Sequence, residues 1–181
     1  MIGLKQGSVY LCEHEAEWEK EAAKTISLLK KILGSVIKDI QHVGSTSIPS
    51  IKAKPIIDIA LAADSFSEVL KFENELKDNG FYFRPSFEDK SQLLFACGSY
   101  YSGTGELQTH FIHVVHTDSA QWRDYINFRD YLNQNPEIAK EYEALKRALA
   151  AAVPASSGRK EYTKGKHDFI AYTLRKALTH S

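Results

Sequence analysis

A short polar turn and a lone carboxylate carry the strongest chemical signal in this sequence. Gly44 and Ser45 follow an apolar segment, and Thr46 extends the run of hydroxyl side chains. Glycine permits close backbone approach, and hydroxyl and amide groups can bind phosphate oxygens. Asp58 stands near the start of a second apolar segment, where burying a carboxylate is costly unless it is paired or metal-bound. The pattern predicts a phosphate-binding turn beside a functional aspartate; the alternative is a serine-rich surface loop with a structural role.

Two histidines in the segment 108–116 are further candidates. On a strand, His110 and His113 would face opposite ways, because their separation is an odd number of residues. They are therefore not expected to bind one ion together. A histidine beside an aspartate suits zinc or manganese better than magnesium, or a general base. A hydrogen-bonded structural histidine is the alternative, and His42 is expected to support the turn.

A basic set lies in two distant parts of the chain. Lys54 leads from the polar turn toward Asp58, and Tyr162 and Lys166 are four residues apart in a segment expected to be helical. Arg159 precedes Tyr162 by three residues and falls on roughly the same helical face. If this helix crosses the mouth of the sheet, the set could meet phosphate groups. The alternative is a solvated helix face with ordinary surface charges.

Hydrophobic periodicity predicts the elements that must position these residues. Strands are expected over residues 8–12, 36–43, 56–63, 81–83, 92–96 and 108–116. Helices are expected over residues 15–32, 66–77, 119–132, 136–152 and 160–178. A hairpin connection is expected over 99–105. The order predicts an α/β (α+β) fold: a mixed β-sheet flanked by helices over about residues 1–118, then a C-terminal helical extension over about residues 119–181.

The same patterns assign several large side chains to structural roles. Arg129 is expected to form a salt bridge within the helical layer. Residues expected in the core are Trp18, Trp122, Tyr125, Phe128 and Tyr142.

Size and composition limit the classes of protein that fit. The 181 residues, 43% of them hydrophobic, suit one soluble domain with an ordinary core. Lys plus Arg and Asp plus Glu each number 23, so the zero net charge argues against general nucleic-acid binding. Cys12 and Cys97 lie far apart and are expected to be free thiols. The sequence has no membrane-spanning run or secretory signal, so a cytoplasmic location is expected.

Several motifs in the same order resemble those of the GrpB-like family. They include the segment 42–60, Trp18 in the first helix, and the segments 110–114, 128–132 and 162–166. This family is assigned to the nucleotidyltransferase (polymerase β-like) superfamily. The resemblance implies a Gly-Ser turn that holds a nucleotide triphosphate and carboxylates on the next strand that hold magnesium. Full enzymes carry two carboxylates two residues apart, whereas here the second position is Ala60.

The resemblance implies a protein that binds a nucleotide or another phosphorylated small molecule and transfers a nucleotidyl or phosphoryl group with a divalent cation. Magnesium or manganese is the expected cation, with zinc a third option. The third carboxylate of the superfamily lies on a neighbouring strand, and the resemblance implies that His113 or His110 could take its place. Asp58 and His113 would be the metal ligands and catalytic residues, and Glu106 could lend a carboxylate from a neighbouring loop. The expected phosphate-binding residues are Gly44, Ser45, Thr46, Lys54, Tyr162 and Lys166. Two alternatives stay open: a non-catalytic accessory or sensor domain with a degenerate metal site, and a metal-dependent hydrolase.

Overall fold

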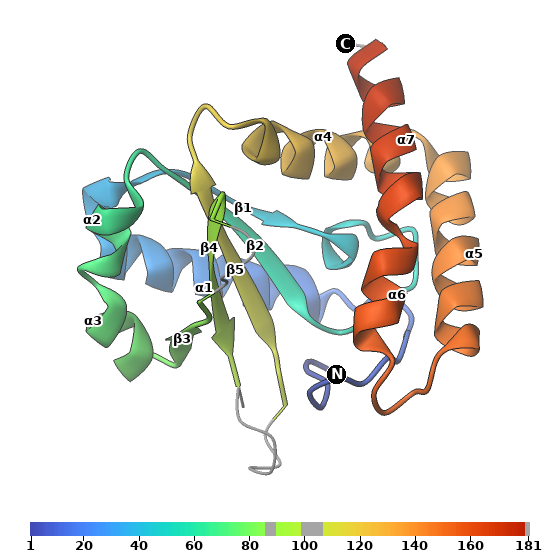
Figure 1. Cartoon of the computed structure of the whole chain (residues 1–181), viewed down its shortest axis with the longest axis horizontal. Coiled ribbons are helices and arrows are strands. Elements are labelled where there is room, and N and C mark those ends of the chain that lie inside the picture. The colour runs from blue at the N-terminus through green and yellow to red at the C-terminus, as the bar shows by residue number, and fades with distance from the viewer. Residues whose placement is uncertain (86–89, 99–106, 180–181) are drawn as a thin grey trace.

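A five-stranded mixed sheet forms the centre of the molecule in the computed structural model, which describes residues 1–85, 90–98 and 107–179 (Figure 1). The strand order is β1-β2-β5-β4-β3. Neighbouring strands are antiparallel except β2 and β5, which run parallel. The strands are β1 (Ile37–Val43), β2 (Ile57–Ala63), β3 (Phe81–Phe83), β4 (Gln92–Cys97) and β5 (His110–His116).

The inner strand β2, between β1 and β5, is apolar almost throughout because both faces of the sheet are covered. All of its residues are buried except Asp58, as expected of a strand with helices on both sides. Helix α1 (Glu17–Leu33) contacts β1 and β2, and helix α4 (Ala120–Gln134) contacts β1, β2 and β5. The predicted mixed sheet, flanked by helices and followed by a helical C-terminal part, is confirmed.

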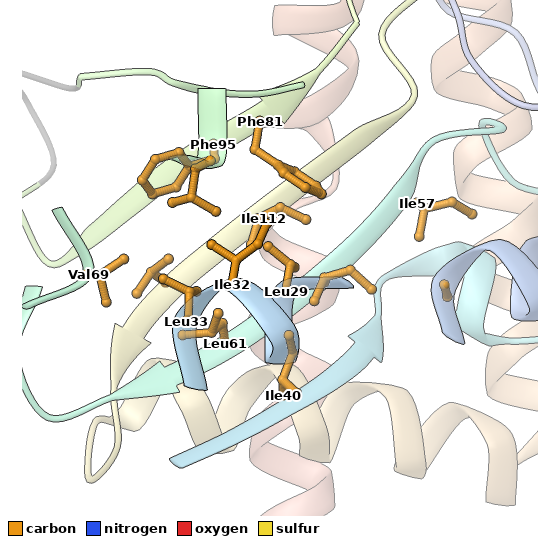
Figure 2. Packing of buried hydrophobic residues seen from close by; sticks show 14 of the residues in the cluster. Leu29, Ile32, Leu33, Ile40, Ile57, Leu61, Val69, Phe81, Phe95 and Ile112 are labelled. Atoms are coloured by element: carbon orange, nitrogen blue, oxygen red, sulfur yellow. The ribbon is translucent and has the colours of Figure 1, made fainter. Parts of the chain in front are cut away.

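The main hydrophobic core lies between α1 and one face of the sheet. Figure 2 shows Leu29, Ile32 and Leu33 among side chains from the strands. Leu61 and Ile112, from the two parallel strands, are 0% and 1% exposed. Burying each such side chain contributes about 1.5–3 kcal/mol, so this face fixes the positions of β2 and β5.

The C-terminal helices form a second layer with a smaller core. They are α4, α5 (Pro136–Ala152), α6 (Arg159–Gly165) and α7 (His167–Thr179). In Figure 1, α4 lies across one end of the sheet, while α6 and α7 follow one another beside α5. Side chains of the polar-turn segment, Ile48 and Ile51, pack with Phe128, Leu132 and Tyr142. This cluster joins the polar turn to the helical layer.

The last predicted helix is wrong in one respect: it is two helices, which meet at Lys166. Gly165 ends α6, and glycine is a poor helix former. A Cβ at Gly165 would lie 2.4 Å from Leu149 Cδ2, so glycine also lets α6 approach α5 closely. The break lets Lys166 lie at the junction of two helices rather than within one.

Two other predicted elements need correction. The helix expected over 66–77 is divided into α2 (Phe66–Leu70) and α3 (Glu73–Asp78). Each helix spans fewer than two turns, so the hydrophobic periodicity of the sequence does not show where one ends and the next begins. The strand expected over 8–12 does not form; Cys12 makes only an isolated bridge to Ala53. Apart from this bridge, the segment 8–12 has no neighbouring strand to pair with, so it does not become a strand.

Other expectations are confirmed or lie outside the described residues. A short 3₁₀ turn, η1 (Gly34–Val36), precedes β1. The cysteines at positions 12 and 97 are free thiols. The expected hairpin over 99–105, and Glu106, fall outside the described residues. Within the ranges described, the helices are all too short or too polar to traverse a lipid bilayer.

Candidate functional site

A cavity of about 780 Å³ lies between the sheet and the C-terminal helices. Its floor comes from β2, β4 and β5, and its walls come from the polar turn, α4, α6 and α7. This volume is in the usual range of small-molecule sites. All eight site residues predicted from the sequence line it: Gly44, Ser45, Thr46, Lys54, Asp58, His113, Tyr162 and Lys166.

Gly44 brings the polar turn against Asp58. Its φ of 71° lies in a region that other residues rarely adopt. A Cβ at this position would lie 2.6 Å from Asp58 Oδ2, too close for any other residue without rearrangement. Ser45–Ser47 then form a short 3₁₀ turn, η2. The Tyr142 hydroxyl of α5 hydrogen bonds to Ser45, which ties this turn to the helical layer.

Thr46 has a supporting position within the same turn. It is only 1% exposed, and its Oγ1 lies 2.9 Å from His42 Nε2. Burial lowers the pKa of His42 to about 4, so this histidine is neutral at pH 7. Arg129 of α4 contacts β1, the strand before the turn, by donating a hydrogen bond to the His42 carbonyl at 3.0 Å. It also forms the expected salt bridge within the helical layer, with Asp130. His42 therefore supports the turn, as predicted.

Asp58 and His113 form a hydrogen-bonded pair on the cavity floor. His113 Nε2 lies 3.2 Å from Asp58 Oδ1, and His113 Nδ1 lies 3.3 Å from Gln92 Oε1 of β4. In the sheet register, His113 pairs with Ala60, the position at which the sequence lacks a second carboxylate. An imidazole from the next strand thus stands beside this position.

His110 points to the opposite face of the sheet, as its spacing from His113 predicts. Its Nε2 lies 3.1 Å from Thr25 Oγ1 of α1, and both side chains are buried. Of the two histidines considered from the sequence, only His113 reaches Asp58.

Two lysines place positive charge beside this pair. Lys54 Nζ and Lys166 Nζ lie 5.2 Å and 4.9 Å from the centroid of the Tyr162 ring, within cation–π range. Neither ammonium group has a hydrogen bond or ion pair with another described residue. Burial lowers the pKa of Lys54 to about 7, and the Lys166 charge acts in the same direction. Burial also lowers the pKa of Lys166, against the opposing effect of Asp58.

The charge of Asp58 is stabilised by its neighbours. Burial alone would raise the pKa of Asp58. The hydrogen bond and charge of His113, with the charges of Lys54 and Lys166, together hold this pKa below its usual value. Asp58 is therefore ionised at neutral pH and faces a cavity with excess positive charge.

Arg159 lines the cavity, but its donors bind the N-terminal segment and Gln108. Nε donates to the Ser8 carbonyl at 2.9 Å, Nη2 donates to the Lys5 carbonyl at 2.7 Å, and Nη1 donates to Gln108 Oε1. Its expected place on the same face as Tyr162 is confirmed by the lining of the cavity. Its hydrogen bonds show an anchoring role for the chain before α1.

The sequence analysis did not predict the wall of the cavity that α4 forms. Gln121, Asp124, Tyr125 and Phe128 of α4 all line the cavity. Their spacing of three and four residues is a helical stripe, which the sequence shows. Tyr125 and Phe128 were predicted to lie in the core, and Gln121 and Asp124 were given no role. Phe128 is buried as expected, but Tyr125 and Trp122 are only half-buried. The Tyr125 hydroxyl reaches Gln92 Oε1 at 3.4 Å, which is a polar contact rather than core packing.

A family comparison gives this arrangement its context. The family model described as GrpB protein matches residues 8–176. The chain belongs to the GrpB family. The glutamate-rich protein GrpB of Alkalihalophilus pseudofirmus is 40% identical over 171 residues, which are 94% of this chain and 96% of that relative.

Solved structures agree with the family and show the fold. The conserved protein GrpB from Enterococcus faecalis is similar with a TM-score of 0.82 and 29% identity, over 94% of this chain and 98% of that one. Cid1 in complex with its short product ApU has a TM-score of 0.51 and 15% identity, over 74% of this chain and 40% of Cid1. At that identity the likeness is one of fold, and the fold of this GrpB chain is that of nucleotidyltransferases.

Proposed function

We propose that this chain binds a nucleotide or another phosphorylated small molecule in the cavity. The observation that carries the proposal is the pair of ammonium groups, on Lys54 and Lys166, that line the cavity without a hydrogen-bonding partner among the described residues. Buried charges are costly unless they are paired. A phosphate group would pair both, and the Ser45 side chain lies on the same cavity wall.

The charges around the cavity support an anionic ligand. Asp58 supplies one negative charge near Lys54 and Lys166, which leaves an excess of positive charge at this end. The lowered pKa of Lys54, about 7, reflects burial and the repulsion between the two lysines. An oxyanion that replaces solvent there would reverse that effect and restore the charged form.

The fold supports a nucleotide as the ligand. Cid1, which shares the nucleotidyltransferase fold, has been solved with its short product ApU. A nucleotide combines phosphate groups with an apolar ring system, and this cavity combines lysines with aromatic side chains.

Transfer of a nucleotidyl or phosphoryl group is the second candidate, and the geometry of Asp58 and His113 favours it. Two atoms on neighbouring positions of an octahedral ion, each about 2.1 Å from it, lie about 3 Å apart. Asp58 Oδ1 and His113 Nε2 are separated by 3.2 Å. These two atoms could hold one manganese, magnesium or zinc ion, which would neutralise phosphate charge when bound.

The remaining coordination positions would fall to phosphate oxygens and water. The described residues include no group of three His, Cys, Asp or Glu side chains arranged to hold a metal ion. The cation would then bind chiefly with the nucleotide. A sensor domain that binds its ligand without a cation is the alternative, and metal dependence separates the two.

A thermal-shift titration tests binding directly. ATP, GTP, CTP, UTP and coenzyme A precursors are each added with Mg²⁺, with Mn²⁺ and with a chelator. Ligand at 100 times its Kd stabilises the folded state by about 2.7 kcal/mol, which is a readily measured shift. Lys166→Gln should lose most of the shift. Lys164→Gln, which changes an exposed lysine of α6 outside the cavity, should keep it.

The outcomes separate the candidate functions. A shift that needs the cation and disappears in Asp58→Asn supports transfer and justifies assays for pyrophosphate release. A shift that persists with the chelator and in Asp58→Asn supports the sensor. The absence of any nucleotide-dependent shift from the folded wild-type protein would contradict the proposed ligand class.

A further inference from the structure

The α4 wall of the cavity differs in charge from the lysine end. Asp124 and Gln121 line the cavity with side chains that make no hydrogen bond or ion pair with another described residue. Both are half-buried, and Asp124 carries a negative charge. A carboxylate on this wall would repel a phosphate group. The part of a ligand that lies beside Asp124 must therefore be something other than phosphate.

The geometry of α4 separates its polar groups from the phosphate end. Phe128 of the same stripe packs with Tyr142, whose hydroxyl reaches Ser45 of the polar turn. At 1.5 Å per residue, Asp124 lies about 6 Å along the helix axis from Phe128, and Gln121 lies about 10 Å from it. Asp58 is the carboxylate whose charge raises the pKa of Lys166.

An aromatic ring lies between the two ends. Tyr125 follows Asp124 on α4, and its ring centroid is 5.2 Å from that of His113. The cavity wall therefore runs from lysines, past the Asp58 and His113 pair, to an aromatic ring and then to acceptor groups. This is the order of parts in a nucleotide: phosphates, the bond to the sugar, and a flat base with hydrogen-bonding edges.

We propose that the α4 wall is a base-recognition subsite, in which Asp124 and Gln121 select a nucleobase that carries an amino group and Tyr125 contacts its ring. This inference rests on the proposed binding function. A carboxylate only accepts hydrogen bonds, so it favours bases that present an exocyclic amino group, and the Gln121 amide can both donate and accept. A site built on such polar groups discriminates strongly against an analogue that lacks the partner group. Aromatic side chains contribute further through stacking.

Paired nucleotides that differ at an amino group test the subsite. The affinities of wild-type protein for GTP against ITP, and for CTP against UTP, are measured by isothermal titration calorimetry, with inorganic tripolyphosphate as the probe without a base. We expect the preferred amino-bearing nucleotide to bind about tenfold or more tightly than its partner. Asp124→Asn should reduce that ratio to near one and leave tripolyphosphate binding unchanged. Gln121→Ala should reduce the ratio by a smaller factor.

Matched variants make the failures distinguishable. Asp118→Asn removes an exposed carboxylate just before α4, outside the cavity, and should leave every affinity unchanged. Equal affinities within both nucleotide pairs, or an unchanged ratio in Asp124→Asn, would overturn the subsite. If tripolyphosphate still binds and Lys166→Gln abolishes that binding, the proposed function survives this failure. If neither tripolyphosphate nor any nucleotide binds the folded wild-type protein, both proposals fail.

Discussion

The two faces of strands β2 and β5 use the same backbone for opposite purposes. On one face, Ile59, Leu61 and Ile112 are 0–1% exposed and pack in the core against α1. On the other face, the side chains of Asp58 and His113 are 31% and 19% exposed and line the cavity. Successive residues of a strand point to opposite faces, so neighbouring positions fall into these two environments.

The difference shows how a polar site can be held rigidly without packing of its own. The α1 face fixes the strands through close-packed apolar side chains, which resist displacement. The opposite face can then leave space, and can keep lysines and a carboxylate at positions that do not favour stability. Changes on the α1 face should therefore affect folding, and changes on the cavity face should affect binding.

The largest expected effect comes from breaking the packed face. Leu61→Ala should lower the free energy of unfolding by about 2–5 kcal/mol, because it removes a fully buried side chain and leaves a cavity. Urea denaturation measures this change. Thr163→Ala, at an exposed residue that lines the cavity, should change it by less than about 0.5 kcal/mol. A loss below about 1 kcal/mol in Leu61→Ala would contradict the division between the faces.

The next largest effect is expected from two glycines, one of which, Gly44, packs against Asp58 on the cavity face. Gly44 and Gly34 both have positive φ, 71° and 53°, but only Gly44 has a close neighbour, Asp58. Gly34→Ala should cost about 1–3 kcal/mol through backbone strain. Gly44→Ala should cost at least about 1 kcal/mol more, because Asp58 must move. Urea denaturation gives both values, and equal losses would show that the contact with Asp58 does not restrict position 44.

Local patterns were sufficient to predict much of the fold and the first set of site residues. The continuous apolar run over 56–63 predicted a strand buried on both faces, and β2 is that strand. Gly44, Ser45 and Asp58 were found because the turn and the carboxylate stand next to apolar strands in the chain. His113 was proposed from the family resemblance, with His110 as the alternative, and parity predicted only that the two histidines face opposite ways. The sheet register places His113 opposite Ala60, beside Asp58.

The α4 wall shows why the rest could not be predicted. Asp124 and Tyr125 belong to an amphipathic stripe, and a stripe of this kind indicates a buried face without showing whether a core or a cavity lies against it. Lys54 and Lys166 are 112 residues apart in sequence. Their shared contact with the Tyr162 ring depends on how α6 and α7 pack over the sheet, which is set by the tertiary fold rather than by local periodicity.

The effect that is smallest for each step of the experiment comes from titrating the cavity, and it sharpens the contrast between the faces. The pKa of Lys54 is lowered by burial to about 7, against 10.5 for an unperturbed lysine. Between these values the unfolded chain binds more protons than the folded one, so the free energy of unfolding should rise with pH. A single lysine contributes at most about 1.4 kcal/mol per pH unit. The rise should be measured by urea denaturation between pH 7 and 9.

Variants assign the rise to the cavity lysine. Lys54→Met should remove part of the slope, and Lys164→Met should leave it unchanged. Lys146, whose pKa is also lowered to about 7, keeps a residual slope of the same sign. Above about pH 10 the trend should reverse. The unfolded lysines then lose their protons, and burial raises the pKa values of Cys97 and Tyr142 to about 12, so the folded state retains protons that the unfolded chain releases. If Lys54→Met keeps the full slope, Lys54 is solvated in the cavity, and the charge argument for an anionic ligand loses its basis.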